Sequence, residues 1–152
     1  MKAIFVVYSN RYLISEKHGN TEKSIEELNK TLELNPSDTY AHFLRGIIYI
    51  ETGHSERAVE DLSRVIVIKP KCAQAYFSRS KAFYFLGNYE NAEGDLAKAL
   101  KLKMNKTDNY YNRGLVHDEQ FFYKKALEDL DNITELEADY VETYFNHCLV
   151  QK

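Results

Sequence analysis

The residues that most often interrupt regular secondary structure recur in this chain at one fixed spacing. Both prolines obey it, at Pro36 and Pro70, and three of the six glycines do so as well, at Gly19, Gly53 and Gly87. Small residues keep the same spacing in two further registers: Gly46, Ser80 and Gly114, then Ala58, Ala92 and Ala126. A fixed period of roughly 34 residues is the signature of a repeat architecture. The sequence therefore predicts stacked copies of one structural unit.

Four units of this length account for most of the chain, which has 152 residues. We place them at 5–38, 39–72, 73–106 and 107–140, which leaves a terminal segment at 141–152. We expect all of them to form a single domain, because units of this kind bury their apolar faces only against neighbours.

Within one unit the apolar spacing is helical twice. In the third unit, one stripe has members three or four residues apart and ends in a glycine, which is typical of a helix end: Tyr76, Ser80, Phe83 and Gly87. A second stripe follows Asn88, a good helix cap: Ala92, Leu96, Ala99 and Leu100. Each unit is thus predicted to be a helix, a short turn and a second helix, and the fold class is all-α.

Composition narrows the range of functions. The formal charge of -3 disfavours sequence-independent binding of nucleic acid, which depends on excess positive charge. The longest apolar run, 3–8, is far shorter than the roughly 20 residues that span a bilayer and too short for a signal peptide. We therefore expect no membrane partner and take the cytoplasm as the default location. Two cysteines do not make a disulfide framework.

These residues resemble the tetratricopeptide repeat family, whose units of about 34 residues are helix-turn-helix pairs. Two segments carry the resemblance best. They are 43–49 followed by Gly53 and Ala58, and 110–114 followed by Ala126 and Leu130. The resemblance implies a right-handed superhelical α-solenoid of four repeats plus a C-terminal helix, with a concave wall made by the first helix of each repeat. The abrupt end of the terminal helix predicts that the natural protein continues with further repeats.

The fourth unit departs from the pattern. Phe121 stands where other units have glycine, and Ala138 stands where they have proline. We expect a less abrupt turn there.

Two charged ladders run through the units. Arginines recur in the first helices, at Arg11, Arg45, Arg79 and Arg113, and acids recur in the second helices, at Glu27, Asp61, Asp95 and Asp129. This matching predicts one ion pair per unit between neighbouring helices. Capture of an external anion is the alternative, and it would require guanidinium groups that are not already paired.

The concave wall implied by the resemblance supplies the candidate ligand-binding residues. They are Tyr40, Phe43, Ile47, Ile50, Phe77, Lys81, Tyr84, Phe85, Tyr111, Leu115, Asp118 and Phe145. Such a groove would be apolar in its middle and acidic toward the C-terminal end, where Glu119 joins Asp118. It would suit a peptide or amphipathic helix with apolar anchors and a basic flank. Aromatic residues at this spacing also pack helices together, so contact with a ligand and a role in the core both remain open.

Some family members clamp the C-terminal carboxylate of chaperone tails with Lys, Arg and Asn. No frame of this sequence places two or three cations at those positions, so we expect no such binding. Nothing indicates catalysis, a metal site or a cofactor. The densest polar cluster, His117-Asp118-Glu119, is interpreted as a solvated helix face.

Two functions follow from these observations. The first is a non-enzymatic scaffold that binds a peptide or helix of another protein in the concave groove. The second is self-association into a homo-oligomer through exposed apolar residues of the first and last helices: Ile4, Phe5, Val7, Tyr8, Val141, Tyr144 and Leu149.

Overall fold

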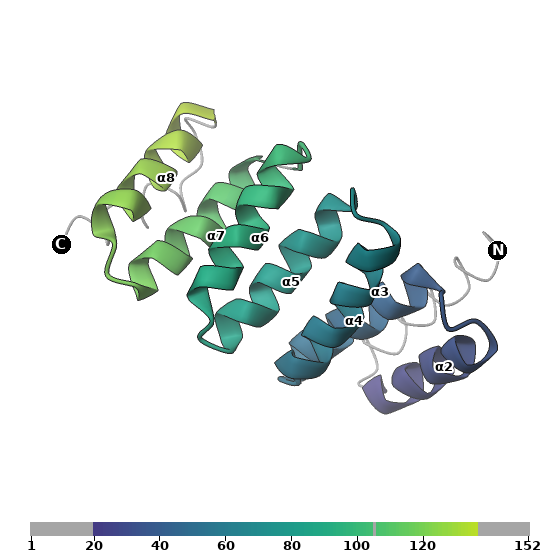
Figure 1. Ribbon diagram of the computed structural model, residues 1–152. Helices are drawn as coiled ribbons and strands as arrows, with labels where there is room; N and C mark the ends of the chain where they lie inside the picture. Colours follow the sequence, from purple (N-terminus) through teal and green to yellow (C-terminus); the bar gives the residue numbers. More distant parts are fainter. Residues whose placement is uncertain (1–19, 105, 137–152) are drawn as a thin grey trace. The chain divides into compact units, whose positions relative to one another are not determined.

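The computed structural model of the chain describes residues 20–104 and 106–136. In these ranges it has seven α-helices and no strand (Figure 1), which confirms the all-α prediction. The helices are α2 (Thr21–Leu34), α3 (Thr39–Glu51), α4 (Ser55–Ile68), α5 (Ala73–Phe85), α6 (Tyr89–Lys101), α7 (Lys106–Glu119) and α8 (Tyr123–Leu136). Their ends follow the predicted repeat units closely, although α7 begins one residue before the fourth unit.

The chain divides into two compact units, Met1–Pro70 and Lys71–Lys152, which we call the first and second unit. The single domain therefore stays a prediction, as does the terminal helix at 141–152, which lies outside the described residues. The 34-residue elements are called repeats below.

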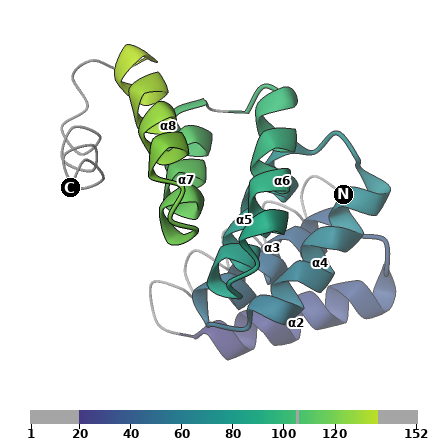
Figure 2. The same ribbon diagram turned by 60° about the vertical axis from the view of Figure 1, so that its left-hand side comes forward.

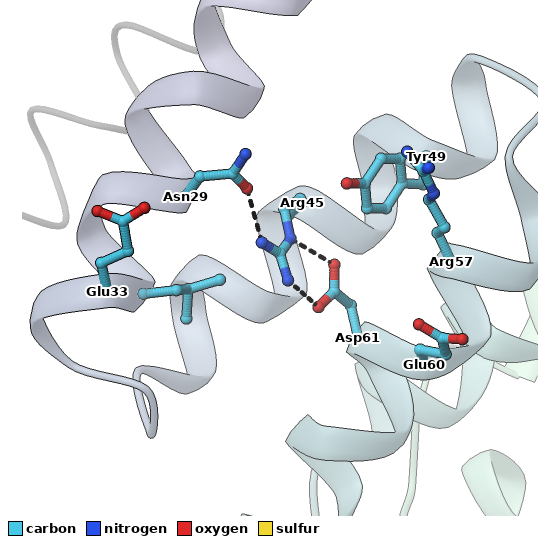
Figure 3. Close-up of a pocket in the computed structure, with 8 residues that line it drawn as sticks. Asn29, Glu33, Arg45, Tyr49, Arg57, Glu60 and Asp61 are labelled. Atoms are coloured by element: carbon cyan, nitrogen blue, oxygen red, sulfur yellow. Dashed lines mark hydrogen bonds and ion pairs between the residues drawn. The ribbon is translucent and has the colours of Figure 1, made fainter.

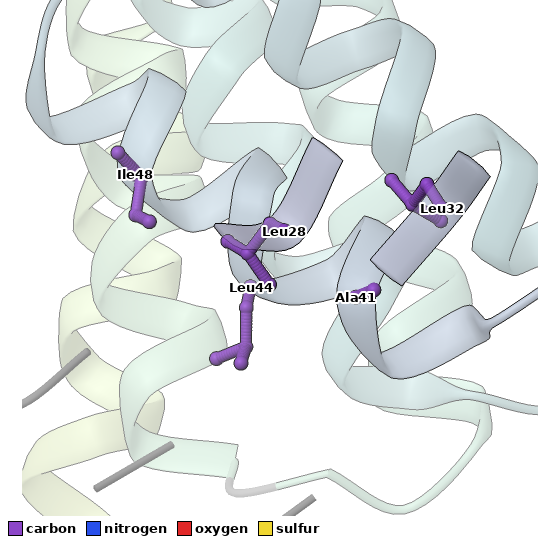
Figure 4. Packing of buried hydrophobic residues seen from close by; sticks show 5 residues of the cluster. All are labelled: Leu28, Leu32, Ala41, Leu44 and Ile48. Carbon is purple, nitrogen blue, oxygen red and sulfur yellow. The ribbon is translucent and has the colours of Figure 1, made fainter. Parts of the chain in front are cut away.

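In the first unit, α3 packs against both α2 and α4. Every third or fourth residue of α2 and α3 turns toward the shared core, as the helical stripe requires. Figure 4 shows this core, formed by Leu28, Leu32, Ala41, Leu44 and Ile48. The side chain of Ile48 is completely buried, and Tyr40 packs against the edge of the cluster.

In the second unit, α5 pairs with α6, α6 with α7, and α7 with α8. Figure 2 shows α5 and α6 side by side, and likewise α7 and α8. The core of this unit draws on three helices and consists of Phe77, Ala92, Leu96, Ala99 and Val116. Because each apolar stripe is covered by the next helix, successive repeats depend on one another for burial.

Paired helices approach closely at the small residues that recur once per repeat. A Cβ atom on Gly46 would lie 2.9 Å from Leu62 Cγ and 3.6 Å from the carbonyl oxygen of Ala58. A Cβ atom on Gly114 would lie 3.7 Å from the carbonyl oxygen of Ala126. At the equivalent position Ser80 is buried, and its hydroxyl donates to the carbonyl oxygen of Phe77 at 2.6 Å.

The turns inside the second, third and fourth repeats share one geometry. Gly53, Gly87 and Phe121 all have a left-handed backbone, with φ of 77°, 73° and 61°. In the fourth repeat, Phe122 N–H donates to the carbonyl oxygen of His117 at 2.8 Å, as Asn88 N–H does to Phe83 in the third at 2.9 Å. These bonds satisfy carbonyl groups at the helix end. The expectation of a less abrupt turn at Phe121 is therefore wrong.

Gly94 offers a test of helix propensity. It is exposed in α6, and a Cβ atom there would meet nothing within 4 Å. Gly94→Ala should therefore raise the free energy of unfolding by about 1 kcal/mol, which a urea titration would show as a higher midpoint. Gly87→Ala is the matched control. It should lower stability by about 1 kcal/mol, because its positive φ disfavours any side chain.

Candidate functional site

The first helix of the second repeat, α3, keeps an apolar face out of the core. The four predicted wall residues on α3 are all partly exposed: Tyr40, Phe43, Ile47 and Ile50. On the opposite side of the same helix, Ala41, Leu44 and Ile48 are buried in the core. Residues three, four and seven positions apart share a helix face, so Phe43, Ile47 and Ile50 form one continuous stripe. We call these three residues the α3 stripe.

The predicted wall residues of the second unit differ more from one another in exposure. Tyr111, Leu115 and Asp118 are partly exposed on α7, whereas Lys81 and Phe85 are exposed on α5, Phe85 to 65%. Phe145 lies outside the described residues. Because Lys81 and Asp118 lie among apolar residues in this set, these positions suit polar as well as apolar contacts.

Phe77 differs from the other predicted wall residues. Only 5% of it is exposed, and it belongs to the core of the second unit. The Lys81 ammonium lies over its ring, 4.7 Å from the ring centroid. Ligand contact by Phe77 stays a prediction, but its replacement by a polar residue would chiefly disrupt the core.

Tyr84 links α5 to α7. Its hydroxyl donates to Glu119 Oε1 at 3.1 Å, and its ring packs against the core of the second unit. Burial, and then the hydrogen bond with Glu119, raise the pKa of Tyr84 to about 12. The phenol therefore remains a protonated hydrogen-bond donor to a higher pH than an ordinary tyrosine.

The predicted ion pairs form in the three repeats that the described residues include. Arg45 donates to Asp61 through Nε at 2.8 Å and through Nη2 at 2.7 Å. Arg79 makes the same two bonds to Asp95, both at 2.7 Å. In the fourth repeat, Arg113 Nη2 approaches Asp129 Oδ1 to 2.6 Å. Arg11 of the first repeat lies outside the described residues.

Each of these carboxylates raises the pKa of its arginine above the usual value. The guanidinium groups are committed to acids of the same repeat, which argues against capture of an external anion at these positions.

Sequence reasoning missed two buried histidines beside this ladder. His42 Nδ1 lies 2.9 Å from Asp61 Oδ1, and His42 Nε2 lies 2.9 Å from the carbonyl oxygen of Pro36. His117 lies between Asp129 Oδ2 and Glu93 Oε1, at 3.0 and 3.1 Å. These two contacts of His117 have ion-pair distances, but their angles do not suit hydrogen bonds.

The interpretation of His117 as part of a solvated face is therefore wrong: only 4% of it is exposed. The repeat register could have indicated that both histidines are special. His42 stands where the next two repeats have Tyr76 and Tyr110, and His117 stands where the previous two have Tyr49 and Phe83.

A pocket of about 520 Å³ lies between α2, α3 and α4 in the first unit. Figure 3 shows its lining residues with Arg45 at the centre, held by Asp61 and by Asn29 Oδ1, the latter at 2.7 Å. The Arg57 guanidinium lies 5.7 Å from the centroid of the Tyr49 ring. The pocket thus belongs to the internal ion-pair ladder and not to the predicted wall.

Two negative findings concern the described ranges only. No helix in 20–104 or 106–136 is both long enough and apolar enough to cross a bilayer. In the same ranges, no three acidic, histidine or cysteine side chains gather as a metal site would require.

The close helix pairs, the shared turn geometry and the recurring ion pairs define an α-solenoid built from helix-turn-helix repeats. Two family models described as tetratricopeptide repeat match residues 27–60 and 48–107. The chain belongs to the tetratricopeptide repeat family. Proteins of this family are protein-interaction scaffolds, and the chain is a scaffold of this general kind.

Solved structures support the same fold. MamA from Desulfovibrio magneticus superposes with a TM-score of 0.84 at 18% identity, over 96% of this chain and 82% of that one. Pseudomonas aeruginosa pilF gives 0.85 at 20% identity, over 98% and 68%. The second TPR domain of human RPAP3, in complex with an HSP70 peptide, gives 0.66 at 24% identity, over 71% and 90%. A comparison with curated proteins found no match. At these identities the likeness concerns the fold alone.

Proposed function

We propose that the protein is a non-enzymatic scaffold that binds a peptide or amphipathic helix of a partner protein on the wall formed by its first helices. The α3 stripe carries this proposal. Its three apolar side chains are partly exposed, although the core of the first unit uses the opposite face of the same helix. Helix-in-groove recognition needs accessible apolar side chains on the receiving surface, and the α3 stripe supplies three of them.

The charges on the proposed wall suggest the chemistry of the partner. Asp118 is partly exposed and Glu119 is exposed on α7, both at the C-terminal end of the wall. A partner with leucine or phenylalanine anchors and a basic flank would complement these residues.

A chaperone tail fits the proposed wall less well, because it would bring its own carboxylates. If the family's carboxylate clamp is aligned to begin in the second repeat, two of its positions fall on Ser78 and Asn112. Ser78 is buried, and Asn112 Nδ2 donates to the carbonyl oxygen of Asp108 within its own helix at 2.7 Å. The RPAP3 domain binds an HSP70 peptide, but we propose a basic and not an acidic partner for this chain.

Ile47→Lys tests the proposal. The probe is a synthetic amphipathic helical peptide with leucine anchors and a lysine flank, and fluorescence anisotropy measures its binding. We expect Ile47→Lys to weaken binding by about tenfold or more, because it places a charge in the centre of the α3 stripe.

Val67→Lys is the matched control. Val67 is 77% exposed on α4, which is the second helix of its repeat and not part of the proposed wall. The variant therefore adds the same charge away from the wall. Equal affinity of both variants and the native chain for the probe would overturn the proposal, as would failure of the native chain to bind it.

A further inference from the structure

The turn between α7 and α8 exposes three aromatic residues in a row. Phe121 is 75% exposed, and Phe122 and Tyr123 are each 47% exposed. The rings of Phe121 and Tyr123 meet edge to face, with centroids 6.1 Å apart. We call Phe121, Phe122 and Tyr123 the aromatic turn. Figures 1 and 2 show it at the same end of the second unit as the turn between α5 and α6.

The fold does not require these residues. The equivalent residues of the second repeat are Gly53, His54 and Ser55, none of which has a large apolar side chain, and Gly53 has the same left-handed backbone as Phe121. Phe121 even works against the turn, because a φ of 61° suits glycine and strains a bulky side chain.

Phe122 carries a second local disadvantage. The equivalent residue in the third repeat, Asn88, caps α6 by accepting the Asn91 N–H at 3.4 Å. A phenylalanine cannot accept such a bond. Residues that break local rules without a structural benefit are expected at functional sites.

The residues that directly follow the aromatic turn are positively charged. Lys124 and Lys125 are exposed, and the Lys125 ammonium lies 5.2 Å from the centroid of the Phe122 ring. The first turn of α8 carries no acidic residue, whereas α2, α4 and α6 each carry a glutamate there. Two acids, Asp118 and Glu119, lie on the other side of the turn at the end of α7, and Glu119 accepts the hydrogen bond from Tyr84.

We propose that the aromatic turn binds a segment of another protein in which an apolar anchor is followed by carboxylates. The anchor would pack on Phe121 and Phe122, and the carboxylates would face Lys124 and Lys125. This surface lies on a turn and not on the wall of the first helices, and it prefers the opposite flank charge. It is therefore a second interaction surface, distinct from the α3 stripe.

Two peptides distinguish the surfaces. Both carry the same leucine anchors, one with an aspartate and glutamate flank and the other with a lysine flank. The native chain should bind the acidic peptide, and Phe121→Gly should weaken that binding by about tenfold or more.

The same variant should raise the melting temperature by about 2 to 5 °C, because glycine relieves the strained backbone. Loss of binding in a more stable protein cannot be explained by unfolding.

Two control variants complete the design. Lys124→Glu with Lys125→Glu should remove the preference for the acidic peptide, and Val67→Lys, at an exposed position outside both surfaces, should leave binding of that peptide unchanged. No binding of the acidic peptide by the native chain, or full binding by Phe121→Gly, would overturn the proposal.

Two further assays decide between occupants. Sedimentation with phosphatidylserine vesicles, if lost in Phe121→Gly, would assign the turn to a membrane and overturn the proposal. Concentration-dependent self-association lost in that variant would assign it to a second copy, with the same consequence.

Discussion

Asp61→Ala should lower the free energy of unfolding by about 3 to 5 kcal/mol, among the largest effects of any single substitution in the chain. Asp61 is 4% exposed, and its carboxylate accepts hydrogen bonds from the Arg45 guanidinium and from the His42 ring at the same time. Removal of the carboxylate leaves the half-buried guanidinium without its main partner. A buried charge without a partner is more costly than the loss of the bonds alone.

Urea denaturation followed by circular dichroism measures this loss. Asp95→Ala is the matched comparison, because Asp95 pairs with Arg79 in the same geometry while Tyr76 stands where the second repeat has His42. We expect about 1 to 3 kcal/mol for that variant. An unchanged urea midpoint in Asp61→Ala would show that the ion pair does not hold the two helices together.

A double variant separates charge from packing. Arg45→Met with Asp61→Leu removes both charges and keeps apolar volume, so it should recover the part of the stability lost to the unpaired guanidinium, while the buried His42 still lacks its carboxylate partner. Failure to recover would indicate that the shape of the pair, with the further bond from Arg45 to Asn29, matters more than its charge.

The ion-pair ladder could be predicted because it depends on register alone. Arginine and aspartate each recur once per repeat at a fixed position, and repeats with the same backbone must place them at the same mutual distance. The pairs confirm this, since each joins residues 16 positions apart in sequence. The small residues at Gly46 and Gly114 were predictable for the same reason.

Burial was harder to predict than register. The aromatic pattern placed Phe77 and Phe43 on the same wall, yet Phe77 is in the core and Phe43 is partly exposed. Helical periodicity gives the direction of a side chain, but the neighbouring helices decide whether that direction is covered. The same limit hid His117, whose acidic neighbours Glu93 and Asp129 come from two other helices.

The turn at Phe121 could not be predicted from local preference. A bulky residue is disfavoured at positive φ, so the sequence favoured a relaxed turn. The bonds from Phe121 and Phe122 N–H to carbonyl groups of α7, together with the packing of α7 against α8, impose the tight geometry. Tertiary structure therefore overrides the preference of one residue.

Leu62→Ala should lower the free energy of unfolding by about 2 to 5 kcal/mol, because Leu62 is fully buried between α3 and α4 and its removal leaves a cavity. Gly46→Ala in the native background should also destabilise. Its new Cβ would lie 2.9 Å from Leu62 Cγ, and the resulting overpacking costs about 1 to 3 kcal/mol, against a gain of about 1 kcal/mol in helix propensity.

The two substitutions together should not add. In the Leu62→Ala background the atoms that Gly46→Ala would meet are gone, and the nearest neighbour left is the carbonyl oxygen of Ala58 at 3.6 Å. There, Gly46→Ala should stabilise by about 1 kcal/mol, so a double-mutant cycle in urea should give a coupling of about 1 to 3 kcal/mol. Gly114→Ala is the control, since its nearest contacts lie at 3.7 Å and it should be tolerated without a second change. Strict additivity at Gly46 and Leu62 would mean that Leu62 moves aside freely, and the close approach would then not explain why glycine occupies this position.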